Sequence, residues 1–462
     1  MRTLLRHGTI VNADGQRRAD VLVDGERIAA IGADLRDPAA RVIDATDRLL
    51  LPGGVDVHTH LDMPLGDVRT ADDFVSGTIA AACGGTTTIV DYATQTKGGS
   101  LREAVDQWMA RAAGQAVIDF GFHVCIADLR PDVEVEMASL VAEGVTSFKL
   151  FMAYPGRLML NDDEIFRVLR RAADVGGLVC LHAENGPVID LLVREALAAG
   201  HTEPLFHART RPALVEAEAV QRGIGLAERA GASLYVVHLS SALGLTQIVA
   251  ARERGLDILA ETCPQYLLLT DAAYKGVPVE AARFVMSPPL RTPGDQDALW
   301  AGLERGDIQV VATDHCPFMT ADKARGLDDF SQIPNGAPGI EHRMTLLYDA
   351  GVAGGRFSLE RFVDVTAASP ARIFGLAPRK GAIAEGADAD IVVFDPTGTT
   401  AISAASHHMR VDYNPYEGRT LRGAVDLVLA RGELVVSGGR YVGAPGRGQF
   451  LKRAPFTPGP WR

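Results

Sequence analysis

Cysteine is scarce in this sequence of 462 residues, which has five cysteines and no Cys-x-x-Cys pair. The five are Cys83, Cys125, Cys180, Cys263 and Cys316. Their odd number and wide spacing exclude a dense disulfide framework and disfavour a zinc site built from cysteine. We therefore expect reduced thiols in a cytoplasmic protein.

Long hydrophobic runs and runs of one charge are also missing. No apolar stretch reaches the roughly 18 residues that cross a bilayer. The 46 basic and 58 acidic residues are scattered and give a net charge of −12. This balance disfavours a nucleic-acid or anionic-membrane partner. The content of 47% hydrophobic and 23% charged residues is that of an ordinary globular protein.

Both ends of the chain have β patterns. Near the N-terminus, Asp24-Gly25 separates two apolar stretches and predicts a hairpin, and 41–54 predicts a further strand pair. The last eighty residues contain short apolar stretches separated by glycine-rich turns. The Pro/Gly-rich tail at 443–462 is expected to be irregular and to pack on a neighbouring subunit.

Between these ends, apolar strand patterns alternate with helical patterns over roughly 300 residues. The helix predicted at 162–177, for example, begins with three acidic residues and ends at two glycines. Such alternation predicts parallel βα units, and their number favours a closed (β/α)₈ barrel over an open sheet. We predict an α/β protein in which this TIM-like barrel (53–376) is inserted in a small β-sandwich built from residues 1–52 and 377–462.

The stretch VDVHTHLDMP places His58 and His60 at the end of the first barrel strand. Residues i and i+2 of a strand point to the same face, so both imidazoles can reach one metal ion. The alternative is two histidines at a polar edge, each satisfied locally.

Four other strand patterns also carry a potential ligand. These residues are Lys149, His182, His238 and Asp314. The last three end their strands, and barrel enzymes build active sites at the carboxyl ends of strands. One such residue is ordinarily a satisfied polar group, but this many on one face indicate a metal site.

Lys149 lies inside the apolar strand VTSFKLF, where an unpaired ammonium is costly. Burial favours the neutral amine, which can take up CO₂ as a carbamate and then bridge two cations. The alternative is a salt bridge to Asp91 or Glu184.

With these residues in place, the chain resembles the amidohydrolase superfamily and is most similar to its hydantoinase/dihydropyrimidinase (cyclic amidohydrolase) family. The resemblance spans essentially the whole chain. Its motifs are GGVDVHTHLDMP, GVTSFKLFMAY, HAENG, VVHLSSA, ETCPQYLLL, MSPPLR, ATDHCPF and IPNGAPGIEHRM. It implies a metal-dependent hydrolase that opens hydantoins or 5,6-dihydropyrimidines to N-carbamoyl amino acids.

The resemblance also implies a role for each site residue. It assigns a first metal ion to His58, His60 and Asp314, a second to His182 and His238, and a bridging N6-carboxylysine to Lys149. In this assignment Asp314 moves a proton from the attacking water to the ring nitrogen. Tyr154 donates a hydrogen bond to the developing oxyanion. Ser287 and Asn335 bind the cyclic imide, largely through backbone groups. For Tyr154 and Ser287 the residues alone favour ordinary loop packing.

Some features separate this chain from other members of the superfamily. Dihydroorotases usually have an arginine two residues after the second histidine, where this chain has Asp62. An allantoinase or another cyclic amidohydrolase is the alternative enzyme, and a non-enzymatic scaffold is disfavoured because all six ligand positions are present. The loops at 61–74 and 154–160 are expected to cover the mouth of the barrel with apolar side chains. His123 is expected to be structural, and His315 to point away from Asp314.

The implied cofactors are two divalent ions, and the nitrogen and oxygen donors favour Zn²⁺ with Mn²⁺, Co²⁺ or Fe²⁺ as alternatives. CO₂ is implied for the carboxylation of Lys149. The expected partners are a small cyclic amide and further copies of the chain, as a tetramer or a dimer.

Overall fold

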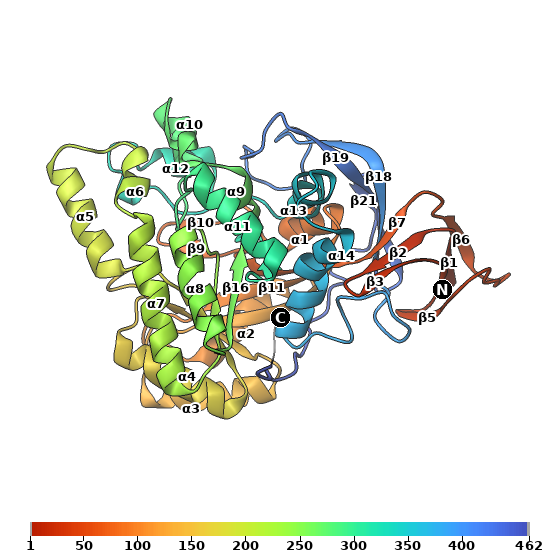
Figure 1. The fold of residues 1–462 in the computed structure, drawn as a ribbon, viewed down its shortest axis with the longest axis horizontal. Coiled ribbons are helices and arrows are strands. Elements are labelled where there is room, and N and C mark those ends of the chain that lie inside the picture. The colour runs from red at the N-terminus through yellow and green to blue at the C-terminus, as the bar shows by residue number, and fades with distance from the viewer. Residues whose placement is uncertain (1, 460–462) are drawn as a thin grey trace.

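The computed structural model describes residues 2–459, and its centre is a sheet of eight parallel strands (Figure 1). In spatial order they are β17 (Val310–Val311), β16 (Ile258–Thr262), β15 (Leu234–Val236), β14 (Leu178–His182), β13 (Ser147–Phe151), β12 (Asp119–Cys125), β11 (Thr86–Thr94) and β8 (Gly54–Thr59). The two outer strands meet where the His60 N–H donates to the His315 carbonyl at 2.9 Å. The sheet is therefore a nearly closed barrel, which confirms the predicted fold class.

Side chains complete the seam between β8 and β17, because β17 has only two residues. Asp56 accepts hydrogen bonds from the Thr313 N–H at 3.1 Å and from Thr313 Oγ1 at 2.7 Å. The buried Arg343 donates to the carbonyl oxygens of Val55 and Val311, at 3.2 and 2.9 Å. These contacts hold the ends of β8 and β17 in a fixed register, and the site depends on that register.

Helices surround the barrel on its outer face (Figure 1). The longer ones are α1 (Phe74–Cys83), α2 (Leu101–Ala112), α3 (Pro131–Ala142), α4 (Asp162–Val175), α5 (Gly186–Ala198), α7 (Ala213–Ala230), α8 (Ala242–Glu253) and α11 (Pro293–Arg305). Shorter ones are α6 (Leu205–Arg209), α9 (Pro264–Leu268), α10 (Pro278–Ala282), α12 (Thr320–Ala324), α13 (Arg343–Leu347), α14 (Leu359–Val363) and α15 (Ser369–Ile373).

Helix α4 follows the start and stop signals of its sequence. Asn161 and Glu164 form a capping box at its N-terminus, and Gly176 ends it in the left-handed conformation at φ +74°. Its buried face consists of Ile165, Val168 and two further apolar residues that point toward the barrel.

The small domain consists of two sheets built from both ends of the chain, to the right of the barrel in Figure 1. One sheet contains β5 (Arg27–Gly32), β4 (Asp20–Asp24), β1 (Arg2–Arg6) and β6 (Arg41–Asp44). The other contains β21 (Arg440–Tyr441), β20 (Glu433–Ser437), β19 (Thr420–Ala430), β18 (Ile391–Ala401), β7 (Leu49–Pro52), β2 (Thr9–Asn12) and β3 (Gly15–Arg18). Leu5, Ile43, Leu50 and Val393 belong to one shared core, as expected for a sandwich.

One local expectation differs from the structure, and the packing of the tail is only partly described by its expectation. Strands β6 and β7 do not pair with each other, because β6 pairs with β1 and β7 with β18 and β2. The tail packs on the barrel of its own chain: Leu451 N–H donates to the Phe120 carbonyl at 2.7 Å, and Arg453 Nη2 to Ser147 Oγ at 2.9 Å. Residues 460–462 lie outside the described part of the tail.

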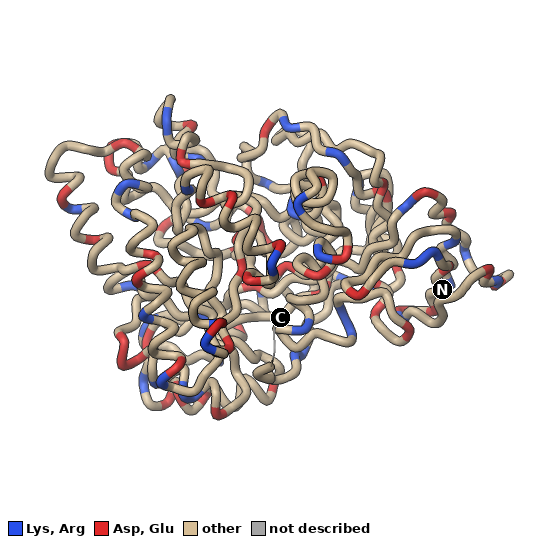
Figure 2. Tube along the Cα trace, viewed as in Figure 1, with Lys and Arg blue, Asp and Glu red and all other residues tan. Residues whose placement is uncertain are grey.

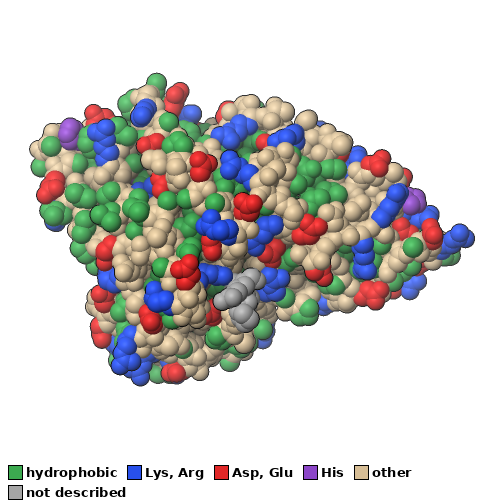
Figure 3. All heavy atoms as spheres, in the orientation of Figure 1, with side chains coloured by type: hydrophobic (Ala, Val, Ile, Leu, Met, Phe, Trp, Pro, Cys, Tyr) green, Lys and Arg blue, Asp and Glu red, His purple; other side chains and the backbone are tan. Residues whose placement is uncertain are grey.

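Among residues 2–459, no helix has the length and apolarity to cross a membrane. Basic and acidic residues alternate along the chain without a long segment of one sign (Figure 2). On the face drawn in Figure 3, both signs are interspersed with apolar side chains.

Candidate metal centre

Five of the six predicted ligands lie at the carboxyl ends of four barrel strands or close beyond them. His58 and His60 come from the end of β8, and His182 is the last residue of β14. His238 lies two residues after β15, and Asp314 lies three residues after β17. Because the strands are parallel, these ends form one rim of the barrel.

The first group of ligands meets at the carboxylate of Asp314. Asp314 Oδ1 lies 3.2 Å from His58 Nε2 and 3.1 Å from His60 Nε2. Two ligands about 2.1 Å from one ion in a tetrahedral site are about 3.4 Å apart. Ligand atoms of His58, His238 and Asp314 also lie within 4.8 Å of one another. This spacing fits a divalent cation among these side chains.

His182 and His238 form the second group. Nδ1 of His182 lies 3.0 Å from Nε2 of His238. Both imidazoles are buried, and burial lowers the pKa of each below its usual value. They are therefore neutral, which is the form of histidine that binds metals.

Glu261, at the end of β16, is a site residue that the sequence analysis missed. It forms a short contact with His58 Nδ1 and accepts hydrogen bonds from Tyr235 OH at 2.8 Å and the His238 N–H at 3.2 Å. With Nδ1 engaged, His58 Nε2 is left without a hydrogen-bond partner among the described residues. A carboxylate that orients a ligand histidine in this way is common in metal sites. Its sequence signal was a charged residue inside the apolar strand LDILAET.

Lys149 is buried in the middle of β13. Its Nζ lies 4.8 Å from the ring centre of Tyr92 and 5.3 Å from that of Phe151. No ion pair joins Lys149 to a carboxylate within residues 2–459, so the alternative pairing with Asp91 or Glu184 is not formed. Burial lowers the pKa of Lys149, which favours the neutral amine that reacts with CO₂.

The three predicted substrate-binding residues also meet. Asn335 Nδ2 donates to Ser287 Oγ at 3.1 Å, and the Tyr154 side chain lies beside both residues. The Tyr154 ring lies 5.5 Å from that of His182. The phenol therefore lies beside the second group of ligands.

Three of these residues have left-handed backbone conformations, at φ +65° for Tyr154, +39° for His238 and +50° for Asp314. Residues other than glycine rarely adopt this conformation, and it costs of order 1–3 kcal/mol. The cost is typical of positions where the fold must aim a functional side chain.

Comparisons with known proteins agree with this geometry. The sequence pattern of the amidohydrolase family matches residues 49–435. The chain belongs to the amidohydrolase family.

Within this family, the chain is similar over nearly its whole length to two D-hydantoinases and to a dihydropyrimidinase of known structure. The D-hydantoinase of Streptomyces coelicolor is 51% identical over 98% of this chain and 98% of its own. The D-hydantoinase of Geobacillus stearothermophilus is 48% identical over 99% of this chain and 97% of its own. The crystal structure of dihydropyrimidinase from Brevibacillus agri has a TM-score of 0.98 at 50% identity, covering 99% of this chain and 100% of that one.

This amidohydrolase is a hydrolase that acts on cyclic amides, as the resemblance implied. The allantoinase alternative is not favoured by these comparisons. The family depends on a pair of metal ions, and the group of His58, His238 and Asp314 is present in this chain.

Other polar residues of the amidohydrolase barrel have structural partners. His315 Nε2 lies 3.1 Å from Asp72 Oδ2, so it points away from Asp314 as expected. His123 hydrogen-bonds with Ser147 Oγ at 2.6 Å. The Asp62 carboxylate lies 2.5 Å from Arg69 Nη1 in an ion pair.

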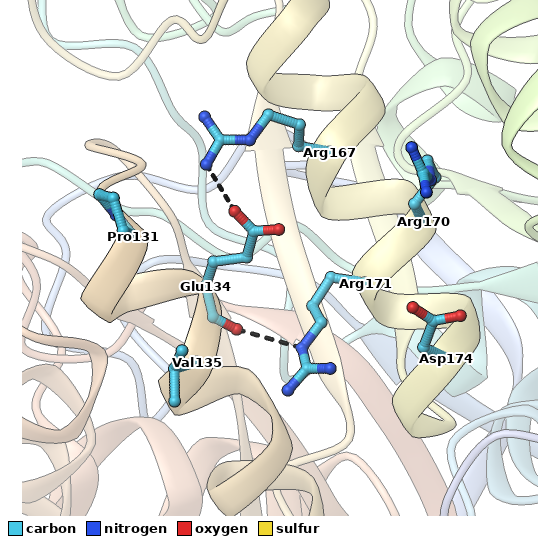
Figure 4. A pocket seen from close by; sticks show the side chains of 7 residues that line it. All are labelled: Pro131, Glu134, Val135, Arg167, Arg170, Arg171 and Asp174. Carbon is cyan, nitrogen blue, oxygen red and sulfur yellow. Dashed lines mark hydrogen bonds and ion pairs between the residues drawn. The ribbon is translucent and has the colours of Figure 1, made fainter.

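A surface pocket of about 530 Å³ lies elsewhere, between α3 and α4 on the outside of the barrel (Figure 4). Arg167 and Glu134 form a 2.5 Å ion pair across it, and Arg171 donates to the Glu134 carbonyl. Its lining contains no histidine. It is therefore separate from the amidohydrolase site.

Proposed function

We propose that this enzyme opens the ring of D-5-substituted hydantoins, and of 5,6-dihydropyrimidines, to N-carbamoyl amino acids. The observation that carries the proposal is the meeting of His58 and His60 at Asp314, next to the pair formed by His182 and His238. The D preference and the two ring sizes follow the names of the similar proteins.

We assign one metal ion to His58, His60 and Asp314, another to His182 and His238, and a bridging carbamate to Lys149. Zinc is the first choice for these donors, and Mn²⁺, Co²⁺ and Fe²⁺ are alternatives. When bound, such a pair of ions supplies Lewis acidity that polarises a carbonyl and lowers the pKa of a water.

Asp314 is the proposed general base and acid. Burial alone would raise the pKa of Asp314, but His58 and the hydrogen bond with His60 lower it to about 2, so the carboxylate is ionised at neutral pH. It accepts a proton from the attacking water and delivers it to the ring nitrogen as the C–N bond breaks.

Tyr154, Ser287 and Asn335 are the proposed binding residues. The Tyr154 hydroxyl donates to the oxygen on which negative charge develops during attack. Burial raises the pKa of Tyr154, which keeps the phenol protonated and able to donate. Ser287 and Asn335 hold the imide edge of the ring, largely through backbone groups.

The ring substituent is expected to lie between the loops at 61–74 and 154–160. Leu65, Val68, Leu158 and Met159 are all half-buried there. A half-buried apolar surface favours an apolar or aryl substituent.

A homo-oligomer of two or four copies is the expected assembly. Helix α5 exposes Val188 and Leu191, and Leu214 at the start of α7 is 68% exposed. An apolar surface of this kind is typical of interfaces between subunits.

A kinetic panel tests the proposed function. Hydantoin and dihydrouracil, each unsubstituted and with a methyl or phenyl group, are compared with allantoin and dihydroorotate at full metal loading. We expect N-carbamoyl products from the first two rings and preference for the D enantiomer. Failure to open either ring, or a strong preference for allantoin, would overturn the proposal.

A further inference from the structure

Lys323, on α12, is a fully buried lysine outside the metal centre. Its exposed fraction is 0%, and Nζ donates to the carbonyl oxygens of Val285 and Pro334 at 2.7 Å and of Gly336 at 2.6 Å. No ion pair joins this ammonium to a carboxylate in the described part of the chain. The main chain alone therefore supplies its hydrogen-bond acceptors.

The ammonium and its acceptors match in number. A lysine ammonium has three N–H donors, and three carbonyl oxygens converge on Lys323. Without a cation between them these oxygens would repel one another, and without them the buried charge would be costly. The Lys323 nitrogen thus occupies a site built from three main-chain carbonyl oxygens.

The three carbonyls belong to the segments that carry the proposed imide-binding residues. Val285 lies two residues before Ser287, and Pro334 and Gly336 lie on either side of Asn335. The Gly336 N–H also donates to the Val285 carbonyl at 3.0 Å. The ammonium therefore joins the segments 285–287 and 334–336 next to the contact between Ser287 and Asn335.

These two segments lie in loops outside any strand, and the hydrogen bond from the Gly336 N–H to the Val285 carbonyl is their direct main-chain contact. Segment 285–287 follows α10, and segment 334–336 follows a short turn of helix at Phe330–Gln332. Gly336 has φ +145°, and a Cβ there would lie 2.2 Å from the Cys316 carbonyl, so the second segment passes close to the strand end that carries Asp314.

We propose that Lys323 is a positioning residue for the cyclic imide, because its ammonium sets the spacing of the two segments that hold the ring. The inference rests on the proposed function, which assigns the ring to Ser287 and Asn335. Lys323 acts through main-chain carbonyls and touches neither the substrate nor a metal ligand. Its loss should weaken substrate binding and leave metal loading intact.

The first test is Lys323→Met, which keeps the length of the side chain and removes every N–H donor. We expect KM for hydantoin to rise roughly tenfold or more, because small displacements of positioning groups have large effects. We expect kcat within about threefold of wild type and an unchanged metal content. The control is Leu140→Ala in the buried face of α3, which lowers the thermal midpoint and leaves KM unchanged.

The second test is chemical rescue of Lys323→Ala. This variant opens a space in front of the three carbonyls that methylammonium can fill with its own N–H donors. Methylammonium chloride should lower KM toward the wild-type value. Tetramethylammonium chloride at the same concentration has no N–H donor and should not.

The outcomes separate the inference from the proposed function. A Met variant with a lower thermal midpoint and wild-type KM overturns the inference, since the role of Lys323 is then stability alone. Wild-type enzyme that opens no cyclic amide overturns the proposed function instead. In that case hydrogen exchange of the Gly336 N–H tests the inference. It should be faster in Lys323→Met than in wild type, and equal exchange rates in the two proteins overturn the inference.

Lys323→Arg keeps the measurement possible if the Met and Ala variants do not fold. It retains the charge and several N–H donors in a larger group, so it should fold and bind substrate with an intermediate KM. A wild-type KM in this variant, with no change in Gly336 exchange, overturns the inference.

Discussion

Nδ1 of His182 and Nε2 of His238 face each other across 3.0 Å, although the two residues are 56 positions apart in the chain. Neighbouring strands β14 and β15 bring them together, and the register of the sheet pairs Leu181 with Val236 just before the two histidines. Two neutral imidazoles at this distance fit the second metal ion proposed for this site.

Replacing Glu261 by glutamine should weaken metal binding at the first site by about 10- to 100-fold, because the carboxylate orients His58. Competition with a chelator of known affinity measures the change. Tyr235→Phe removes only one hydrogen bond to the same carboxylate and should have a smaller effect. A Glu261→Gln variant with wild-type metal affinity would contradict an orienting role for Glu261.

Replacing Lys149 by arginine should abolish the carbamate, since a guanidinium does not react with CO₂. The variant should bind fewer than two ions and lose roughly 10²-fold or more in kcat/KM. Metal-stripped wild-type protein should regain activity faster in the presence of bicarbonate. The exposed Lys275→Arg is the matched control, and bicarbonate-independent reloading of the wild type would speak against the modification.

Tyr154→Phe should lower kcat by about 10²- to 10³-fold, which is typical of removing one donor to an oxyanion. The ring stays and only the hydroxyl is lost, so KM should change little. Steady-state kinetics on hydantoin provides both values. Tyr441→Phe, in the small domain, is the control, and equal kcat in both variants would remove Tyr154 from the chemistry.

His408, which is not a predicted metal ligand, predicts a pH dependence of stability. Hydrogen bonds with Cys83 and Glu341 raise the pKa of His408 to about 10, from about 6.5 in an unfolded chain. The protonated imidazole therefore stabilises the fold fully below pH 6.5, and this contribution is lost as the pH rises toward 10. The side chain is partly exposed, so we expect about 1 kcal/mol.

Urea unfolding between pH 6 and 10 measures this contribution. His408→Gln should be less stable than wild type at pH 6 and nearly equal to it at pH 10. His201→Gln, at an exposed histidine, should follow the wild-type curve throughout. A difference between His408→Gln and wild type that stays constant with pH would contradict the assignment.

The strand patterns were sufficient to predict the barrel and the sandwich, and the resemblance of the motifs predicted the family. Alternation along a strand predicted that His58 and His60 reach one point, and both lie within 3.2 Å of Asp314. The division of the chain at 52/53 and 376/377, and the roles of the site residues, stay predictions.

Other features depend on contacts that a linear pattern does not contain. Glu261 was missed because its importance comes from His58, 203 residues away. The left-handed φ angles of Tyr154, His238 and Asp314 arise where the chain leaves the barrel rim, and none of these residue types requires that conformation. The composition of the tail did not predict that its main chain pairs with Phe120 of strand β12 in the same chain, and its expected contact with a neighbouring subunit stays a prediction.

Titration of metal-free protein with Zn²⁺, followed by hydantoin hydrolysis and elemental analysis, tests the central claim most directly. We predict that activity rises with bound metal and saturates at about two ions per chain. We also predict that His238→Ala saturates at about one ion with little activity. Full activity in metal-free protein, or two ions bound tightly by His238→Ala, would contradict a catalytic centre built from these strand ends.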